Sequence, residues 1–377
     1  MCCQNFIQME ITTKWVLLLS MAATLLSILI IFTSWAYVGP CDWIGRLNFD
    51  PPPVISYPNE IPDQADNDTI SSFVVIGDTQ RTSFWECVIG REVNDNETKS
   101  LIKEISVANA QFLVFLGDMV FDGGNEKHWQ YFDRLIMPLR ETKMPILPVL
   151  GNHEYWGNRA AARSYVQERF QNMRNTTWYS KRNGPLGMIF MNSNHDEMSN
   201  SMWANQIDWL KLLILEWDSK NDIKGIILFA HHPPFTNSVV VSSDTKVRND
   251  IVRIFCETQK ALLMVTGHAH GYERFENMDD ALNCSINYNS NDTHIKISNI
   301  IHRKQAVQFI VSGGGGGPRP SELRSVYLDS FKGPSPRPFN YLIIESADNG
   351  IKISIHGLKK GQTRTHKLEE LKLEFKI

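Results

Sequence analysis

Short apolar runs alternate with polar segments along most of the chain, and a polar motif directly follows five of these runs. Unbroken apolar runs of this length are typical of parallel strands that are buried on both faces. Open α/β sheets build their sites at the C-terminal ends of such strands. We therefore expect an α/β fold whose strands deliver polar side chains to one place. The runs and their motifs are FVVI with GDTQ (77–80), FLVFL with GDMV (117–120), PILPVL with GNHE (151–154), GIILFA with HHPP (231–234) and ALLMVT with GHAH (267–270).

Other segments between and after these runs have the periodicity of regular structure. The 3.6-residue pattern predicts helices over 97–109, 205–220 and 250–260. After residue 270 the pattern changes to strands joined by Gly- and Pro-rich turns, and it predicts strands over 306–312, 341–346 and 351–356. Together these elements indicate one catalytic domain over residues 71–377.

The five motifs supply carboxylate, amide and imidazole side chains, a set that can hold two metal ions. Carboxylate and imidazole ligands suit Mn, Fe or Zn. Two such ions, about 3.5–4 Å apart, can neutralise a phosphoryl group, generate hydroxide near neutral pH and stabilise the leaving oxygen of a phosphate ester. The pattern therefore indicates a metallohydrolase. The candidate ligands are Asp78, Asp118, Asn152, His231, His268 and His270.

The motif order GD, GD, GNH[DE], H, GHxH, which runs from Gly77 to His270, resembles the calcineurin-like metallophosphoesterase superfamily. The string GHAHGYER (267–274), together with GNHEY and GGGGGP, is most similar to the purple acid phosphatase-like branch. The resemblance covers residues 70–356. It implies a four-layer αββα sandwich of two mixed β-sheets flanked by helices, with a dinuclear metal site at the C-terminal ends of the strands.

The resemblance also implies roles for single residues. Asp118 would bridge both ions, since a carboxylate can offer one oxygen to each. His153 would be catalytic, because it would contact the phosphate or protonate the leaving alkoxide. The alternative for His153 is a hydrogen-bonded structural histidine. Besides Asp118, the implied ligands are Asp78 and His270 at the first site and Asn152, His231 and His268 at the second.

Two positions depart from the family pattern. Many members have a histidine ligand two residues after the first aspartate, where this chain has Gln80. We include Gln80 among the metal ligands and expect a weaker first site, because an amide oxygen is a poorer ligand. Purple acid phosphatases have a metal-bound tyrosine where this chain has Phe121. We therefore expect a colourless protein with two divalent ions, while mixed-valence occupation by Mn, Fe or Zn stays open.

Several residues near the motifs have two interpretations each. Arg81 either meets a phosphate or forms an exposed salt bridge. Asn158 and Arg159 are candidates for substrate contact, because they follow GNHEYW. The run Gly313–Gly317 lacks the lysine of a P-loop, so we expect it to let the backbone pass close to the site.

The N-terminal part predicts a membrane segment. The 24 residues from Trp15 to Val38 carry no charge, and at ~1.5 Å per residue a helix of this length spans a ~30 Å hydrocarbon core. We expect residues 1–14 to be a cytoplasmic N-terminus, 15–38 a transmembrane anchor and 39–70 a Pro-rich tether. The alternative for 15–38 is a cleaved signal peptide, although the run exceeds the usual h-region of about 7–15 residues.

The side of the membrane follows from the flanking charges. Lys14 and the amino terminus oppose only Glu10, so the positive-inside rule places the catalytic domain outside the cytoplasm, in a periplasmic, lumenal or extracellular space. A cleaved segment would make the protein secreted. Four cysteines would then lie outside, and they allow three disulfide pairings among which the sequence does not choose. They are Cys41, Cys87, Cys256 and Cys284.

Composition limits the partners. A net charge of -3 on 377 residues gives no electrostatic reason to expect nucleic acid. The partners we expect are a phosphate-ester substrate and a membrane, and the oligomeric state stays open. The expected function is that of a membrane-anchored, extracytoplasmic phosphomonoesterase, similar to an acid phosphatase, in which metal-bound hydroxide attacks phosphorus. The alternatives are a phosphodiesterase or nucleotide pyrophosphatase on the same core, and a catalytically silent binding protein.

Overall fold

The computed structural model describes residues 15–16, 18–29, 56–58, 60, 71–276, 278, 306–347 and 349–375. Within these residues the chain forms two compact units, one from residues 1–50 and 82–92 and the other from 51–81 and 93–377. The first unit contains the helix α3 (Phe84–Val88), which begins with a capping box between Ser83 and Glu86. This box satisfies backbone N–H groups at the start of the helix.

The described part of the predicted anchor is helical and apolar. Residues 15–16 and 18–29 are helical, and their large apolar side chains are exposed. Among the described residues, no helix has the length and apolar character needed to cross a membrane. Residues 30–38 of the predicted anchor, and most of the predicted tether, lie outside the described residues.

The larger unit contains two six-stranded sheets. The first sheet has the order β12-β11-β10-β1-β2-β3. Its strands β1, β2 and β3 are parallel, whereas β10, β11 and β12 are antiparallel to their neighbours. The strands are β1 (Ser71–Ile76), β2 (Phe112–Phe115), β3 (Ile146–Pro148), β10 (Phe339–Ala347), β11 (Gly350–Leu358) and β12 (His366–Glu374).

The second sheet has the order β4-β5-β6-β7-β9-β8. Its four central strands are parallel, and β4 and β8 lie antiparallel at the two edges. The strands are β4 (Tyr179–Asn183), β5 (Leu186–Phe190), β6 (Gly225–Phe229), β7 (Ala261–Thr266), β8 (Tyr272–Phe275) and β9 (Gln308–Ser312).

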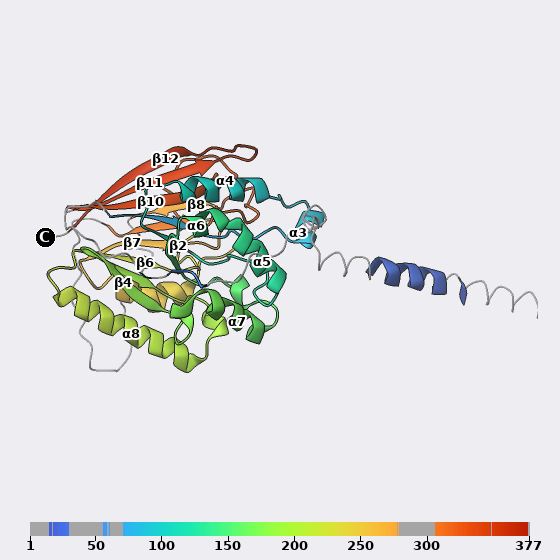
Figure 1. The fold of residues 1–377 in the computed structure, drawn as a ribbon, viewed down its shortest axis with the longest axis horizontal. Helices are drawn as coiled ribbons and strands as arrows, with labels where there is room; N and C mark the ends of the chain where they lie inside the picture. Colours follow the sequence, from blue (N-terminus) through green and yellow to red (C-terminus); the bar gives the residue numbers. More distant parts are fainter. Residues whose placement is uncertain are drawn as a thin grey trace, which may run out of the picture. The chain divides into compact units, whose positions relative to one another are not determined.

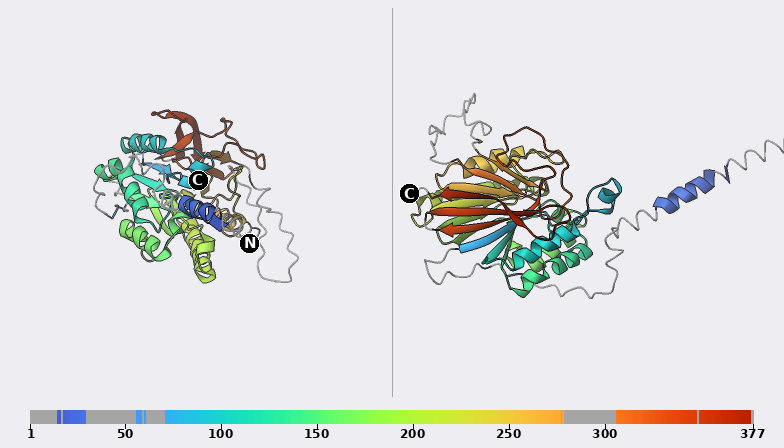
Figure 2. Two further views of the ribbon diagram at one scale, coloured as in Figure 1. Left: turned by 90° about the vertical axis from the view of Figure 1, so that its right-hand side faces the viewer. Right: turned by 90° about the horizontal axis from the view of Figure 1, so that it is seen from above.

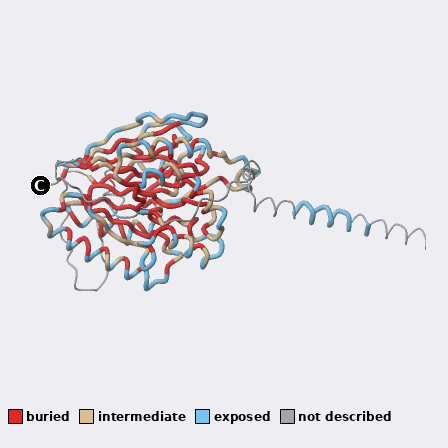
Figure 3. The backbone as a smooth tube through the Cα atoms, in the orientation of Figure 1, coloured by how far each residue is buried: buried red, intermediate tan, exposed pale blue. Residues whose placement is uncertain are grey.

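The side chains of the apolar runs are buried on both faces of each sheet. The sequence predicted this, because the runs are not interrupted by alternating polar residues. In β1, Phe73 and Val75 join the cluster between the two sheets, whereas Val74 and Ile76 join the cluster on the outer face. Successive side chains of a strand point to opposite faces, so both faces of this strand need cover. Figure 3 shows the resulting buried strands at the centre of this unit.

Helices cover the outer face of each sheet (Figures 1 and 2). One set packs with the first sheet through a cluster that includes Trp129, Phe132 and Phe170. The other set packs with the second sheet through Leu210, Trp217 and Phe255. The first set is α4 (Asp95–Ser106), α5 (Glu126–Leu135), α6 (Met137–Glu141) and α7 (Arg159–Arg169), and the second is α8 (Asn200–Ser219), the π-helical turn η4 (Val247–Val252) and α9 (Arg253–Phe255).

This arrangement confirms the predicted fold class, two mixed sheets flanked by helices. The predicted helices over 97–109 and 205–220 correspond to α4 and α8. The helix predicted over 250–260 ends earlier, at Phe255. Its end is followed by a turn in which the Thr258 hydroxyl accepts the N–H of Lys260 at 3.1 Å.

Candidate metal centre

The predicted ligands follow the C-terminal ends of parallel strands. In the first sheet, Asp78 follows β1, Asp118 follows β2 and Asn152 follows β3. In the second sheet, His231 follows β6 and His268 follows β7. Parallel strands end at one edge of a sheet, so each sheet contributes its polar side chains from one edge. This is the arrangement that the run-and-motif pattern predicted.

Four of these residues have a left-handed backbone. The φ angle is +59° at Asp78, +51° at Asp118, +66° at His268 and +50° at His270. Such angles are uncommon outside glycine and cluster at functional sites, where the surrounding structure maintains them. The turns are also tight, because a Cβ atom added at Gly151 would lie 2.1 Å from Asp118 Oδ1. Gly151 is therefore needed for the close approach of the GNHE loop to the GDMV loop.

Asp78, Asp118 and His231 form the most deeply buried group of the site. Each offers one ligand atom, and the three atoms lie within 4.8 Å of one another. His231 Nε2 lies 3.3 Å from Asp118 Oδ2. Asp78 accepts the backbone N–H of His268 at 2.8 Å, and its Oδ1 lies 3.5 Å from His270 Nε2. Both sheets therefore contribute donor atoms to one cluster.

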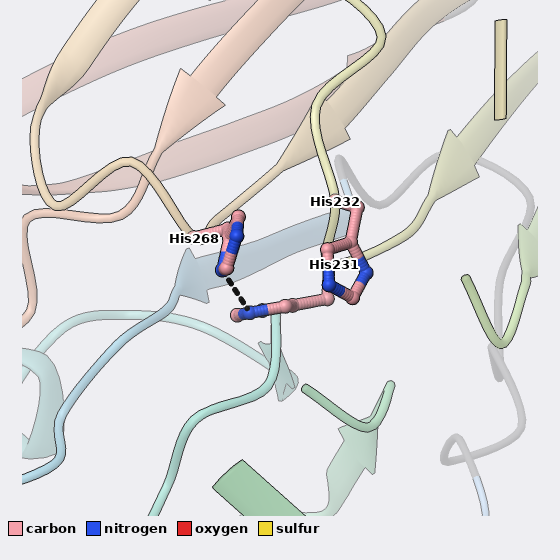
Figure 4. Close-up of side chains that lie close together, drawn as sticks. All are labelled: His231, His232 and His268. Atoms are coloured by element: carbon pink, nitrogen blue, oxygen red, sulfur yellow. Dashed lines mark hydrogen bonds between the residues drawn. The ribbon is translucent and has the colours of Figure 1, made fainter. Parts of the chain in front are cut away.

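The amide and imidazole ligands predicted for the second site also lie together. Asn152 Oδ1 lies 3.2 Å from His231 Nε2. His268 Nδ1 lies 3.1 Å from the same nitrogen, and this contact is the dashed line of Figure 4. The candidate ligands thus form one connected cluster, in which each residue contacts at least one other.

Backbone carbonyls orient two of the imidazoles. His231 Nδ1 lies 2.7 Å from the carbonyl oxygen of Leu116, and His270 Nδ1 lies 3.0 Å from that of Pro318. A carbonyl only accepts, so in each ring Nδ1 carries a proton and Nε2 is the nitrogen available to a metal ion. Metal-binding histidines are commonly oriented in this way. Both Nε2 atoms face the carboxylates.

Gln80 lies inside the cluster. Its Nε2 is 3.3 Å from Asp118 Oδ2 and 3.0 Å from His270 Nε2. Its Oε1 is buried and has no hydrogen-bond partner among the described residues. The oxygen and nitrogen of an amide are assigned from their surroundings. A rotated amide would place Oε1 among the donors, which fits the candidate role of Gln80 as a ligand.

His153 lies beside the bridging candidate. Its backbone N–H donates to Asp118 Oδ1 at 3.1 Å, and its Nε2 lies 3.8 Å from Asp118 Oδ2. Its Nδ1 lies 2.6 Å from the carbonyl oxygen of Phe121, which directs Nε2 toward the cluster. Phe121 itself has no side-chain oxygen, and its ring packs 5.2 Å from that of His153. The expectation of a colourless protein stays a prediction.

The electrostatics indicate a site for cations. Burial raises the pKa of Asp78 well above its usual range, and neighbouring Asp118 adds to this although His231 lowers it. Burial lowers the pKa of His231, but Asp118 outweighs it and raises the pKa to about 9. A proton on His231 therefore offsets part of the buried negative charge. A divalent cation would offset it more fully, so this donor set fits the implied metals.

Two other residues bind the site together, and the sequence analysis gave them no role. The Glu154 carboxylate accepts backbone N–H groups from both the GDMV and the GNHE motifs. The Ser193 hydroxyl accepts the N–H groups of His231 and His232 at 3.2 and 2.9 Å. The polar string NSN (192–194), directly after the buried strand β5, was the signal for Ser193.

His232 also lies beside the ligand cluster. Its ring centroid is 4.5 Å from that of His268 and 4.9 Å from that of His231 (Figure 4). Its Nδ1 lies 2.9 Å from Ser193 Oγ. Together with His231 and His268 it forms a second group that could hold a metal ion.

The remaining candidates for phosphate or substrate contact form salt bridges or a helix cap. Arg81 forms the salt bridge with Asp95, at 2.8 Å. The side chain of Asn158 accepts the N–H of Ala161 and caps α7. Arg159 pairs with Glu197 at 2.9 Å. These contacts favour the structural interpretation for each residue.

The glycine run passes close to the site, as predicted. Gly315 N–H donates to the Gly77 carbonyl and Gly317 N–H to the Asp78 carbonyl, both at 2.9 Å. A Cβ atom at Gly313 would lie 2.8 Å from Asp78 Oδ2. The run therefore supports the loop that carries Asp78.

A family model described as calcineurin-like phosphoesterase matches residues 71–272, more than half of the chain. Among solved structures, purple acid phosphatase PPD1 from yellow lupin is similar, with 18% identity and a TM-score of 0.53. The match covers 82% of this chain but only 54% of the lupin chain.

Two smaller structures have the same fold. GAP50, the anchor in the inner membrane complex of Plasmodium, has 16% identity and a TM-score of 0.55, over 82% of this chain and 90% of its own. A dimetal phosphatase from Danio rerio has 14% identity and a TM-score of 0.53, over 82% of this chain and 100% of its own. At such low identity these likenesses establish the fold.

The family model and the site together support a hydrolase that acts on phosphate esters, with side chains that could hold a metal ion. The chain belongs to the calcineurin-like phosphoesterase family. The family uses a dinuclear metal site, and the buried carboxylate and imidazole cluster gives this chain a plausible one. The resemblance drawn from the motifs is thereby confirmed.

Proposed function

We propose that this protein is a membrane-anchored, extracytoplasmic phosphomonoesterase. The observation that carries the catalytic part is the contact of His153 with Asp118, because it places a proton-carrying group beside the candidate bridging ligand. Two bound metal ions would neutralise the phosphoryl oxygens and supply the hydroxide that attacks phosphorus. The chain's own residues provide the rest of the reaction.

We assign the metal ligands according to the clusters. Asp118 Oδ2 lies 3.3 Å from both Gln80 Nε2 and His231 Nε2, so Asp118 would be shared by both ions. The Nε2 atoms of His231 and His270, which point away from the carbonyls beside Nδ1, would bind metal directly. The first site would consist of Asp78, Gln80, Asp118 and His270, and the second of Asp118, Asn152, His231 and His268.

His153 would act on the leaving group. Its Nδ1 is bound to the Phe121 carbonyl, so the ring cannot turn away and Nε2 faces the site. A proton held at Nε2 can pass to the oxygen of the departing alkoxide, a step that contributes typically ~10²–10⁴-fold to a rate.

The location rests on the N-terminal segment. Its described helix exposes apolar side chains, among them Leu19, Leu25 and Leu29, at 57–66% of their full area. An apolar helix with exposed side chains needs a partner, and a bilayer is the partner that the uncharged run from Trp15 to Val38 fits. Protease protection in sealed vesicles tests the topology. We expect the catalytic domain to be protected on the lumenal side, and a domain digested from the cytoplasmic side would contradict the proposal.

Activity is tested with the full-length chain in detergent. We expect hydrolysis of p-nitrophenyl phosphate, faster than that of bis-p-nitrophenyl phosphate, when Mn, Fe or Zn is added. The substitution Asp118→Ala should abolish it, whereas Asp208→Ala should not, because Asp208 is an exposed residue of α8. Preference for the diester would favour a phosphodiesterase. No hydrolysis and no metal binding would favour a silent member of the fold, for which an anchoring role like that of GAP50 is the precedent.

A further inference from the structure

An exposed tryptophan stands beside the proposed proton donor. The Trp156 ring lies 3.8 Å from that of His153, measured between centroids, at an interplanar angle of 36°. Phe121 meets Trp156 edge-to-face at 5.5 Å. Trp156 nevertheless keeps 41% of its area exposed. The three rings therefore form a wall, the aromatic wall of Phe121, His153 and Trp156, next to the metal cluster.

The backbone holds this wall rigidly. The Trp156 N–H donates to the His153 carbonyl at 3.2 Å, and the Trp156 carbonyl accepts the N–H of Gly124 at 2.9 Å. The next residue, Gly157, has a φ angle of +75°, and a Cβ atom there would lie 2.3 Å from Asp122 Oδ1. The chain thus turns sharply after Trp156 and fixes the position of its ring. A fixed aromatic surface loses little entropy when a ligand stacks on it.

The position of the wall follows the path of a leaving group. His153 Nε2 lies 3.8 Å from Asp118 Oδ2, so a proton on this nitrogen would face the place where the phosphate of a substrate binds. The organic part of the ester is attached to the oxygen that receives this proton. It would therefore leave the site beside His153, where the neighbouring exposed ring is that of Trp156. A flat apolar ring there suits a planar aromatic group, which can stack at about 3.5–4.0 Å between carbon atoms.

We propose that Trp156 is the leaving-group platform of this enzyme and that the preferred substrates are phosphomonoesters with a planar aromatic leaving group. This inference rests on the proposed phosphomonoesterase function. In the reaction, the P–O bond to the aryl oxygen breaks and the oxygen of a water molecule bonds to phosphorus. The aryl oxygen takes one proton and leaves as a phenol.

Trp156 could instead serve only to orient His153. The two roles predict different effects of removing the Trp156 ring, and the experiment compares these effects. If Trp156 only orients His153, its loss lowers the turnover of butyl phosphate at least as much as that of 1-naphthyl phosphate, because the more basic butoxide depends more on protonation as it leaves. If it stacks on the leaving group, its loss acts on aryl esters alone, mainly through KM. The experiment measures phosphate release from 1-naphthyl phosphate and from butyl phosphate by the full-length, metal-loaded protein. The variants are Trp156→Leu, Trp156→Phe and the control Trp209→Leu, which alters a partly buried tryptophan of α8.

We expect Trp156→Leu to reduce the naphthyl-to-butyl ratio of kcat/KM about 10-fold, which corresponds to ~1.4 kcal/mol. Trp156→Phe should restore most of the ratio, because it keeps an aromatic face, and Trp209→Leu should leave it unchanged. Equal losses for both esters, or a larger loss for butyl phosphate, would overturn the platform and leave the phosphatase proposal standing. Absence of hydrolysis of either ester by the unaltered, metal-loaded protein would overturn both proposals.

Discussion

Glu154 Oε2 accepts the backbone N–H of Asp118 at 2.8 Å, although the two residues are 36 positions apart. The same carboxylate accepts the N–H groups of Met119, Val120 and Gly151 at 2.8, 3.4 and 2.7 Å. One side chain of the GNHE motif therefore fixes the GDMV loop and the start of its own loop. Asp118 keeps its left-handed backbone because Glu154 holds the peptide in that turn.

Glu154→Gln should weaken both the fold and the metal site. The amide offers one acceptor in place of two and brings its own N–H groups toward donors. We expect a loss of about 3 kcal/mol in the free energy of unfolding, and metal affinity lower by about 10- to 100-fold. Urea unfolding and calorimetric titration with Mn²⁺ measure these effects.

The control is Glu126→Gln, on the exposed first turn of α5. It should change stability by no more than about 0.5 kcal/mol. A Glu154→Gln protein with unaltered Mn²⁺ affinity would show that the four hydrogen bonds do not position Asp118.

Gln80→His should strengthen the first metal site. Gln80 already lies within 3.3 Å of both Asp118 and His270, so an imidazole there would add a better donor to an existing cluster. We expect Mn²⁺ or Zn²⁺ affinity to rise about 10-fold, or ~1.4 kcal/mol. The comparison variant Gln80→Leu, which has no donor atom, should lower it. Calorimetric titration distinguishes the three proteins, and weaker binding by Gln80→His would remove Gln80 from the ligand set.

Glu273 should make stability depend on pH. Burial raises its pKa to about 7, although the Asn237 N–H and the Thr236 hydroxyl lower it by hydrogen bonding. The folded pKa lies above the unfolded value of 4.5, so the folded state binds more protons between these values. Its contribution to stability is therefore complete below pH 4.5 and is lost as the pH rises to about 7.

In this window the free energy of unfolding should fall by up to ~1.4 kcal/mol per pH unit relative to Glu273→Gln, which does not titrate. Urea unfolding of both proteins between pH 4.5 and 8 measures the difference. Parallel curves for the two proteins would mean that Glu273 titrates alike in the folded and unfolded states.

The buried pair of Arg169 and Asp133 should be sensitive to the loss of one partner. Their side chains are 0% exposed, and Arg169 Nη2 lies 2.6 Å from Asp133 Oδ2. Asp133 also accepts the hydroxyl of Tyr57. Asp133→Ala would leave a buried guanidinium without its counter-ion, and we expect a loss of about 3–5 kcal/mol in unfolding experiments. The exposed pair of Lys211 and Asp208 gives the control, because Asp208→Ala should cost at most about 1 kcal/mol.

The parts of the fold that could be predicted are those with a local signal. Each buried parallel strand is an unbroken apolar run, and each candidate ligand stands directly after one, as Asp118 does after β2. The edge strands β4 and β12 could not be found in this way. Of the nine residues of β12, only Leu373 is buried, so its sequence reads as a charged surface segment.

Contacts between distant segments also lack a local signal. The sequence shows that Glu154 belongs to the GNHE motif. Its hydrogen bonds to the GDMV loop depend on the pairing of β2 with β3, which brings the two loops together. Ser193 supports His231 from the loop after β5, which carries no predicted ligand. The role of Trp156 could not be predicted, because a single aromatic residue on a loop gives no periodic pattern. Its proposed role depends on its contact with His153, which only the structure shows.

The ligand cluster draws on both sheets, Asp78 and Asp118 from the first and His231 and His268 from the second. Metal ions bound by this set would therefore link the two sheets, which are otherwise joined by apolar packing and by side-chain hydrogen bonds such as that of Ser312 to Asn340. The stability of the sandwich would then rise with the free metal concentration, by RT ln(1 + [M]/Kd). The supply of metal in its compartment would determine how long the folded protein lasts as well as how fast it works.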